Sequence, residues 1–169
     1  MPAYSHRFYV NCTEAIDLLN ITHDVKRAIC DSQIKNGLAC VLVPLGAGGV
    51  AILENDPSVQ EAFRDLLVSL VPETSGERPV RHSKTGAPHA HLRALFTHPS
   101  LTVPVINGEL GIGHWQELIL YDFDDRIARR EFLVHIVDGG AADGASGASA
   151  RGGPRGGGQS LPPGRAKAV

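Results

Sequence analysis

The stretch LTVPVINGELGIGHWQELILYDFDDRIARREFLVHIV, residues 101–137, contains three short apolar runs separated by turn-forming residues. The runs cover residues 101–106, 117–123 and 129–137, and each has the length and the β-branched or aromatic content of a strand. Asn107-Gly108 lies between the first two runs and is a strong turn signal. We therefore predict three strands in this part of the chain.

The residues before this stretch predict more strands and several helices. Apolar patterns indicate strands at 5–12, 15–19, 38–43 and 50–53, the last two joined by a glycine-rich turn at 46–49. Helical spacing predicts helices at 22–32, 57–70 and 89–96, with Thr22 as N-cap of the first and Pro57 opening the second. Strands outnumber helices and do not alternate regularly with them, so the sequence predicts an α+β fold.

A change of composition after Asp138 divides the chain. The last 31 residues hold ten of the 19 glycines and carry a net charge of +3, whereas the whole chain carries −2. Such a segment cannot bury enough apolar surface to offset its chain entropy. We predict a folded domain at residues 1–138 and a disordered Gly/Ala/Pro/Arg-rich tail at 139–169. The domain is then net acidic, which makes nucleic acid an unexpected partner.

The cellular compartment is predicted from absent signals. The chain has three cysteines and no CxxC pair, which favours reduced, buried thiols. Its first residues contain no apolar leader segment, and the longest apolar run, residues 38–45, is too short to span a bilayer. We expect a cytoplasmic protein with no membrane partner.

Histidine is the residue type that invites a site hypothesis. Five of the eight histidines fall between His82 and His114, in a loop-rich region. No HExxH or HxxxH pair is present, and His89 and His91 are two residues apart, which points them to different sides of a helix. Taken one at a time, we interpret each histidine as a surface or structural residue rather than a metal ligand.

An ordered set of motifs leads further. The first motifs along the chain are L-N-I-T at 19–22, G-L at 37–38, E-N at 54–55 and His82. They are followed by A-H-L at 90–92, P-V at 104–105, N-G-E-L at 107–110 and G-I-G-H-W-Q at 111–116. The last are F-D at 123–124 and Arg129. Together they resemble the YjbQ family, also called the secondary thiamine-phosphate synthase family, from about residue 9 to residue 137.

The resemblance implies a small α+β fold of two packed β-sheets with two or three helices, usually assembled as a homotrimer. It also implies three histidines gathered around a divalent metal ion that is zinc-like or Mg²⁺. The implied activity is weak and secondary: a pyrimidine pyrophosphate is joined to a thiazole phosphate to give thiamine phosphate. The implied partners are further copies of the chain and a small phosphorylated substrate.

Two of the three family histidines match residues of this chain, His82 and His91. Glu54 matches the family carboxylate, so the resemblance assigns catalytic roles to Glu54, His82 and His91. The third family histidine falls at Leu45, and leucine can neither bind a metal nor carry a proton. The remaining departures are Leu53 at the asparagine before the family glutamate, His114 at the threonine of G-T-W-Q, and D-D-R-I-A-R at 124–129 in place of D-G-P-R-x-R.

These departures leave three interpretations open. The first is a degenerate family member with at most weak thiamine-phosphate synthase activity and a metal site weakened by Leu45. The second is an active metal-dependent enzyme in which His114 or His89 completes the site, giving His82, His91 and His114 as one ligand set. The third is a non-catalytic binding or scaffold protein whose basic tail contacts RNA or a partner.

Overall fold

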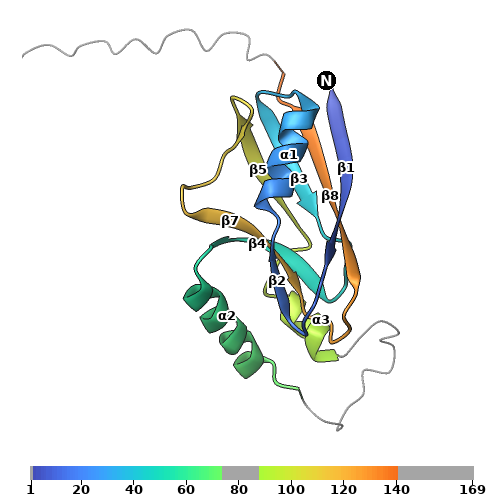
Figure 1. Cartoon of the computed structure of the whole chain (residues 1–169), viewed down its shortest axis with the longest axis vertical. Coiled ribbons are helices and arrows are strands. Elements are labelled where there is room, and N and C mark those ends of the chain that lie inside the picture. The colour runs from blue at the N-terminus through green and yellow to red at the C-terminus, as the bar shows by residue number, and fades with distance from the viewer. Residues whose placement is uncertain (1, 74–87, 141–169) are drawn as a thin grey trace, which may run out of the picture.

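The computed structural model describes residues 2–73 and 88–140 of the 169-residue chain (Figure 1). The helices are α1 (Thr22–Ser32), α2 (Pro57–Leu70) and α3 (Pro88–Ala94). The strands are β1 (Ala3–Asn11), β2 (Asp17–Asn20), β3 (Gly37–Leu42), β4 (Gly48–Glu54), β5 (Ser100–Ile106), β6 (Glu109–Leu110), β7 (Gln116–Asp122) and β8 (Arg129–Asp138). His82 and all but the first two residues of the predicted tail lie outside the described residues, so the domain boundary stays a prediction.

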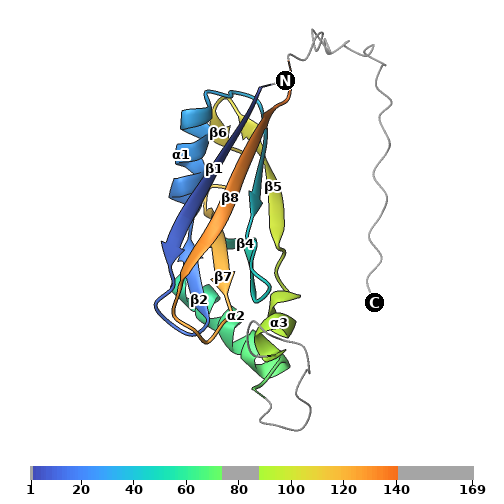
Figure 2. The same ribbon diagram turned by 90° about the vertical axis from the view of Figure 1, so that its right-hand side faces the viewer.

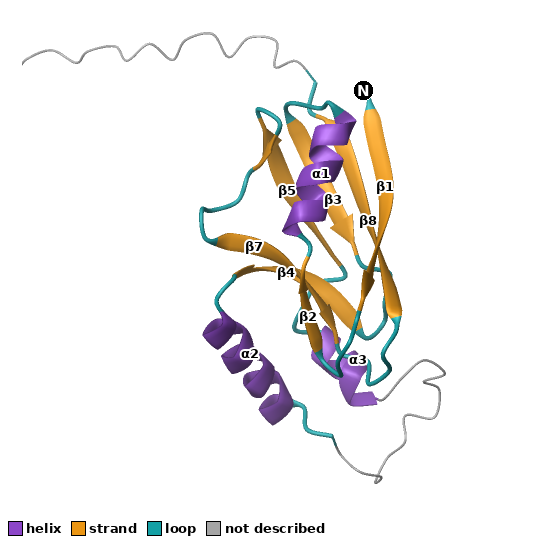
Figure 3. Ribbon diagram, in the orientation of Figure 1, coloured by secondary structure: helices purple, strands orange, loops and turns teal. Residues whose placement is uncertain are grey.

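The strands form two antiparallel sheets (Figures 1 and 3). One sheet has the order β1-β8-β3-β5-β6, and the other has the order β2-β7-β4. Helix α1 runs along the five-stranded sheet, while α2 and α3 lie at the other end of the molecule, beside the three-stranded sheet (Figure 2). The predicted α+β fold with two packed sheets is confirmed.

Strand β7 is the centre of the packing. Its side chains alternate between two apolar clusters: Leu118 and Leu120 join the cluster under α1, and Ile119 and Tyr121 join the one under α2 and α3. All four are at most 1% exposed. Because each fully buried side chain of this size contributes about 1.5–3 kcal/mol, this strand holds the two layers together.

Helix α1 begins differently from the prediction. We expected Thr22 to cap it, but this is wrong: the N-cap residue is Ile21, and no side chain caps the helix. The hydroxyl of Thr22 instead accepts a hydrogen bond of 2.8 Å from the backbone N–H of Leu118 in β7. The hydroxyl therefore joins the helix start to the three-stranded sheet rather than closing the first turn.

Helices α2 and α3 are joined by a buried arginine. Asp56 accepts a hydrogen bond from the N–H of Ser58 and caps α2 at its start. Near the other end, Arg93 of α3 is 1% exposed, and its Nε donates to the carbonyl oxygen of Val71 at 3.0 Å. The bond fixes the end of α2 against α3, on the two sides of residues 74–87, which the structure does not describe.

Other details also differ from the sequence-based expectations. The turn at Asn107-Gly108 is followed by the two-residue strand β6, which we had not predicted. The three cysteines are free, but only Cys12 is buried, so the expectation of burial is wrong for Cys30, which is exposed. Among the described residues, no helix combines the length and apolar character that crossing a membrane requires.

Candidate functional site

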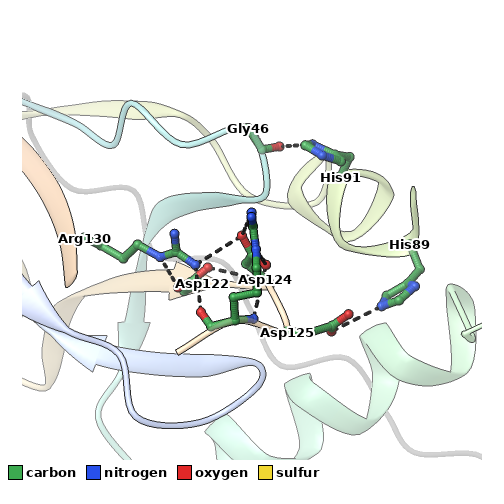
Figure 4. Close-up of polar contacts among 8 residues, drawn as sticks. Gly46, His89, His91, Asp122, Asp124, Asp125 and Arg130 are labelled. Carbon is green, nitrogen blue, oxygen red and sulfur yellow. Dashed lines mark hydrogen bonds and ion pairs between the residues drawn. The ribbon is translucent and has the colours of Figure 1, made fainter. Parts of the chain in front are cut away.

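His91 lies at the α3 end of the molecule and contacts the turn that precedes β4 (Figure 4). Its Nδ1 is 2.8 Å from the carbonyl oxygen of Gly46. A carbonyl can only accept, so Nδ1 donates, and in the neutral ring Nε2 carries the lone pair. A backbone carbonyl holding one ring nitrogen is the usual arrangement of a metal-binding or proton-accepting histidine.

The position of the missing family histidine is next to this bond. Leu45 precedes Gly46 and is half-buried, with its side chain packed against the larger apolar cluster. A Cβ on Gly46 would come within 3.1 Å of Cε1 of His91, which shows how closely the turn approaches the ring. The resemblance and the fold therefore agree that residue 45 and His91 are neighbours, although 45 is a leucine.

Glu54 and His114 are at the other end of β4. Glu54 is the last residue of this strand and pairs with Gln116, whereas the turn at residue 46 precedes its first residue. A strand of this length spans about 20 Å. His114 packs edge-on against Trp115, with 4.7 Å between the ring centroids. Within one chain, neither Glu54 nor His114 comes close to His91.

His89 lies on α3 but faces away from His91, as the spacing of two residues predicted (Figure 4). Its Nε2 is 3.6 Å from a carboxylate oxygen of Glu73 and 3.5 Å from one of Asp125. The three ligand atoms lie within 4.8 Å of one another. His89 therefore belongs to a different group of side chains from His91.

A buried ionic cluster supports the loop between β7 and β8 (Figure 4). Nε of Arg130 donates to Asp122 at 2.5 Å, and the Arg130 guanidinium lies 3.2 Å from Asp124. Asp124 also accepts two bonds from the Arg126 side chain. Both carboxylates are nearly inaccessible, with side chains 1% and 2% exposed. The sequence drew attention to Asp124 through the family motif, but it did not predict the contacts of this cluster, because they depend on how the loop folds.

The cluster changes the protonation of its members. The Arg126 side chain holds the pKa of Asp124 at about 2, against the opposing effect of burial. Burial, together with the hydrogen bond to Asp122, raises the pKa of the Cys12 thiol to about 12. The carboxylate is thus ionised and the thiol neutral at physiological pH, so this cluster is a rigid support and not a nucleophile or a base.

Two arginines that could neutralise a pyrophosphate, Arg126 and the family arginine Arg129, are placed apart. Arg126 bonds to Asp124. Arg129 lies over the ring of Tyr9, with 4.3 Å between its guanidinium carbon and the ring centroid. A third arginine, Arg81, lies outside the described residues.

The fold and this end of the molecule define a class: small α+β domains of two packed antiparallel sheets with a histidine-bearing helix at one end. A sequence profile described as UPF0047 protein YjbQ-like matches residues 6–139. The chain belongs to this family.

Individual relatives support this family membership. A UPF0047 protein of Synechocystis is 34% identical over 130 residues, covering 75% of this chain and 87% of that protein. One of Mycobacterium tuberculosis is 36% identical over 116 residues, covering 69% of this chain and 86% of that protein. A solved structure of a YjbQ/UPF0047 protein from Clostridium acetobutylicum has a TM-score of 0.71 at 27% identity, covering 78% of this chain and 99% of that one.

Proposed function

We propose that this protein is a YjbQ-family member whose thiamine-phosphate synthase activity is weak or lost because Leu45 replaces the first family histidine. The contact between His91 and Gly46 carries the proposal, since it puts residue 45 next to a matched histidine. A leucine there removes one ligand of three, and water would have to replace it. Weaker binding of a divalent metal follows.

The predicted donor set does not fit a metal within one chain. Of Glu54, His91 and His114, only His91 lies at the α3 end, and His82 is outside the described residues. When bound, a divalent ion would stabilise charge on a departing pyrophosphate. What the chain itself supplies in its described part is one oriented imidazole, and this supports the degenerate interpretation over the one in which His114 or His89 completes the site.

The activity can be measured directly. Supplied with the pyrimidine pyrophosphate, the thiazole phosphate and Mg²⁺, the full chain is expected to form thiamine phosphate at least about tenfold more slowly than a relative that has all three histidines, because losing a metal partner has this scale of effect. Product formation is followed by chromatography. A rate equal to that of the complete relative would contradict the proposal.

We also propose a homotrimer, as the resemblance implies. The support is the outer face of the five-stranded sheet, where Leu38, Leu42 and Ile106 are 48%, 36% and 54% exposed. A sheet face that meets water is usually polar, so these side chains favour a covering copy of the chain. Light scattering of the full chain at micromolar concentration should give three times the chain mass, and a clean monomer would contradict this.

A further inference from the structure

We propose that Glu73, His89 and Asp125 form a cation site, separate from the His91 position, that takes a divalent transition metal of the zinc class. The three residues come from three places: Glu73 follows α2, His89 is on α3 and Asp125 is in the loop between β7 and β8. The site does not depend on the proposed function, because none of the three is a family histidine or Glu54.

The chemistry of the group favours a cation. An imidazole nitrogen and two carboxylate oxygens converge, so that three lone-pair-bearing atoms face one another unless a proton or a metal ion lies among them. Imidazole and carboxylate are ligands that zinc and similar ions accept, and two carboxylates match the charge of a divalent ion. A fourth position would be open to water, because the Glu73 and Asp125 side chains are 69% and 48% exposed.

The distances favour a metal over a shared proton. Separations of 3.5 and 3.6 Å between Nε2 and the two carboxylate oxygens exceed the 2.7–3.2 Å of a good N–H···O bond. Ligands held at about 2.0–2.1 Å around a tetrahedral zinc ion are about 3.3 Å apart. Small side-chain adjustments would therefore bring all three atoms onto one ion.

The state of His89 supports the same conclusion. Its side chain is 13% exposed, and its Nε2 is shielded from solvent with no hydrogen-bond partner among the described residues. A buried polar nitrogen left in this state is costly. Arg93, four residues further along α3, forms no ion pair with Glu73 or Asp125 in the described part of the chain, and its Nε donates to the carbonyl of Val71.

Asp125 also departs from the family pattern. In D-G-P-R-x-R the residue after the first aspartate is glycine, and here it is Asp125. The loop that carries it is fixed by the bonds between Asp124 and Arg126. The carboxylate is therefore presented to His89 by a rigid segment, as a ligand requires.

A metal held here would join α2, α3 and the β7–β8 loop, and binding to the folded state alone raises stability. We expect zinc added to the full chain to bind one ion per chain at this site and to raise the thermal unfolding midpoint by at least about 5 °C at a hundredfold excess over its dissociation constant. Cobalt in place of zinc should give the visible absorption of a low-coordinate site. Calorimetry, cobalt absorption and thermal unfolding are the three readouts.

Variants separate this site from the His91 position. Glu73→Gln, His89→Gln and Asp125→Asn should each weaken zinc binding by at least about tenfold and abolish the midpoint shift. Glu73 is exposed, so Glu73→Gln tests the proposal even if the other variants fold poorly. His91→Ala and His23→Ala should retain the shift. Loss of binding in His91→Ala with retention in Glu73→Gln and Asp125→Asn would overturn the proposal, and so would the absence of saturable zinc binding to the wild type.

Discussion

Replacing Arg130 by methionine is expected to lower the free energy of unfolding by about 3–5 kcal/mol. Methionine keeps much of the aliphatic volume but removes the charge that Asp122 contacts at 2.5 Å. Among the described residues, the hydrogen-bond donors left to Asp122 would be neutral ones, the Cys12 thiol and the N–H of Asp124. A carboxylate with a side chain 1% exposed would then be buried without a counter-charge.

Arg126→Met is the matched control. Arg126 also bonds to Asp124, but its side chain is 63% exposed, and Asp124 keeps Arg130, so the expected loss is at most about 1 kcal/mol. Adding Asp122→Asn to Arg130→Met should recover much of the stability, because no buried charge is then left unpaired. Urea unfolding measures all four proteins. Equal losses in Arg126→Met and Arg130→Met would show that Asp122 does not depend on Arg130.

Leu45→His is expected to strengthen divalent-metal binding at the His91 position by at least about tenfold, since it restores a ligand beside an imidazole that Gly46 already orients. Thiamine-phosphate formation should rise with it. The change removes apolar packing from a half-buried position, so a small loss of stability should accompany the gain. Metal content by mass spectrometry and product formation are measured together.

Three control variants test whether the gain in metal binding arises at the His91 position. Leu38→His adds an imidazole on β3 in the other sheet, on the face assigned to the subunit contact, and should raise neither metal content nor product formation. Leu45→His with His91→Ala should lose the added metal, whereas Leu45→His with His114→Thr should keep it, because His114 lies beyond the far end of β4. If His114→Thr removes the metal as fully as His91→Ala, the ligands come from more than one chain, and the idea of a site at one end of a single chain is wrong.

The sequence predicted most of the helices and strands because the spacing of apolar residues that marks each one lies within that segment. The run at 117–123 is apolar except for Glu117 and Asp122, and it largely coincides with β7 (Gln116–Asp122), the buried centre of the fold. The short helix ends earlier than its pattern indicates: α3 stops at Ala94, and His98 then pairs with Val50 of β4. That contact joins two residues that are 48 positions apart in the sequence. The spacing of apolar residues along a helix cannot predict it.

The site was less predictable, because its contacts join residues that are far apart in the sequence. The resemblance identified His91 and the loss at Leu45, and the fold brings these positions together. It also assigned Glu54 and His114 to the same pocket, and the length of β4 separates them from His91 within one chain. Two further contacts depend on how α3 and the β7–β8 loop pack, and neither has a sequence signature. They are the approach of His89 to Asp125 and the buried pair of Asp122 and Arg130.

The bond from Arg93 to Val71 has a consequence for how this family can diversify. Because it holds Val71, at the end of α2, against Arg93 of α3, insertions and deletions between the two helices need not move α3 or His91. Each doubling of a closed loop costs only about 0.6 kcal/mol of chain entropy. Relatives can therefore differ in chain length between α2 and α3 while α3 and His91 keep their place on the same scaffold.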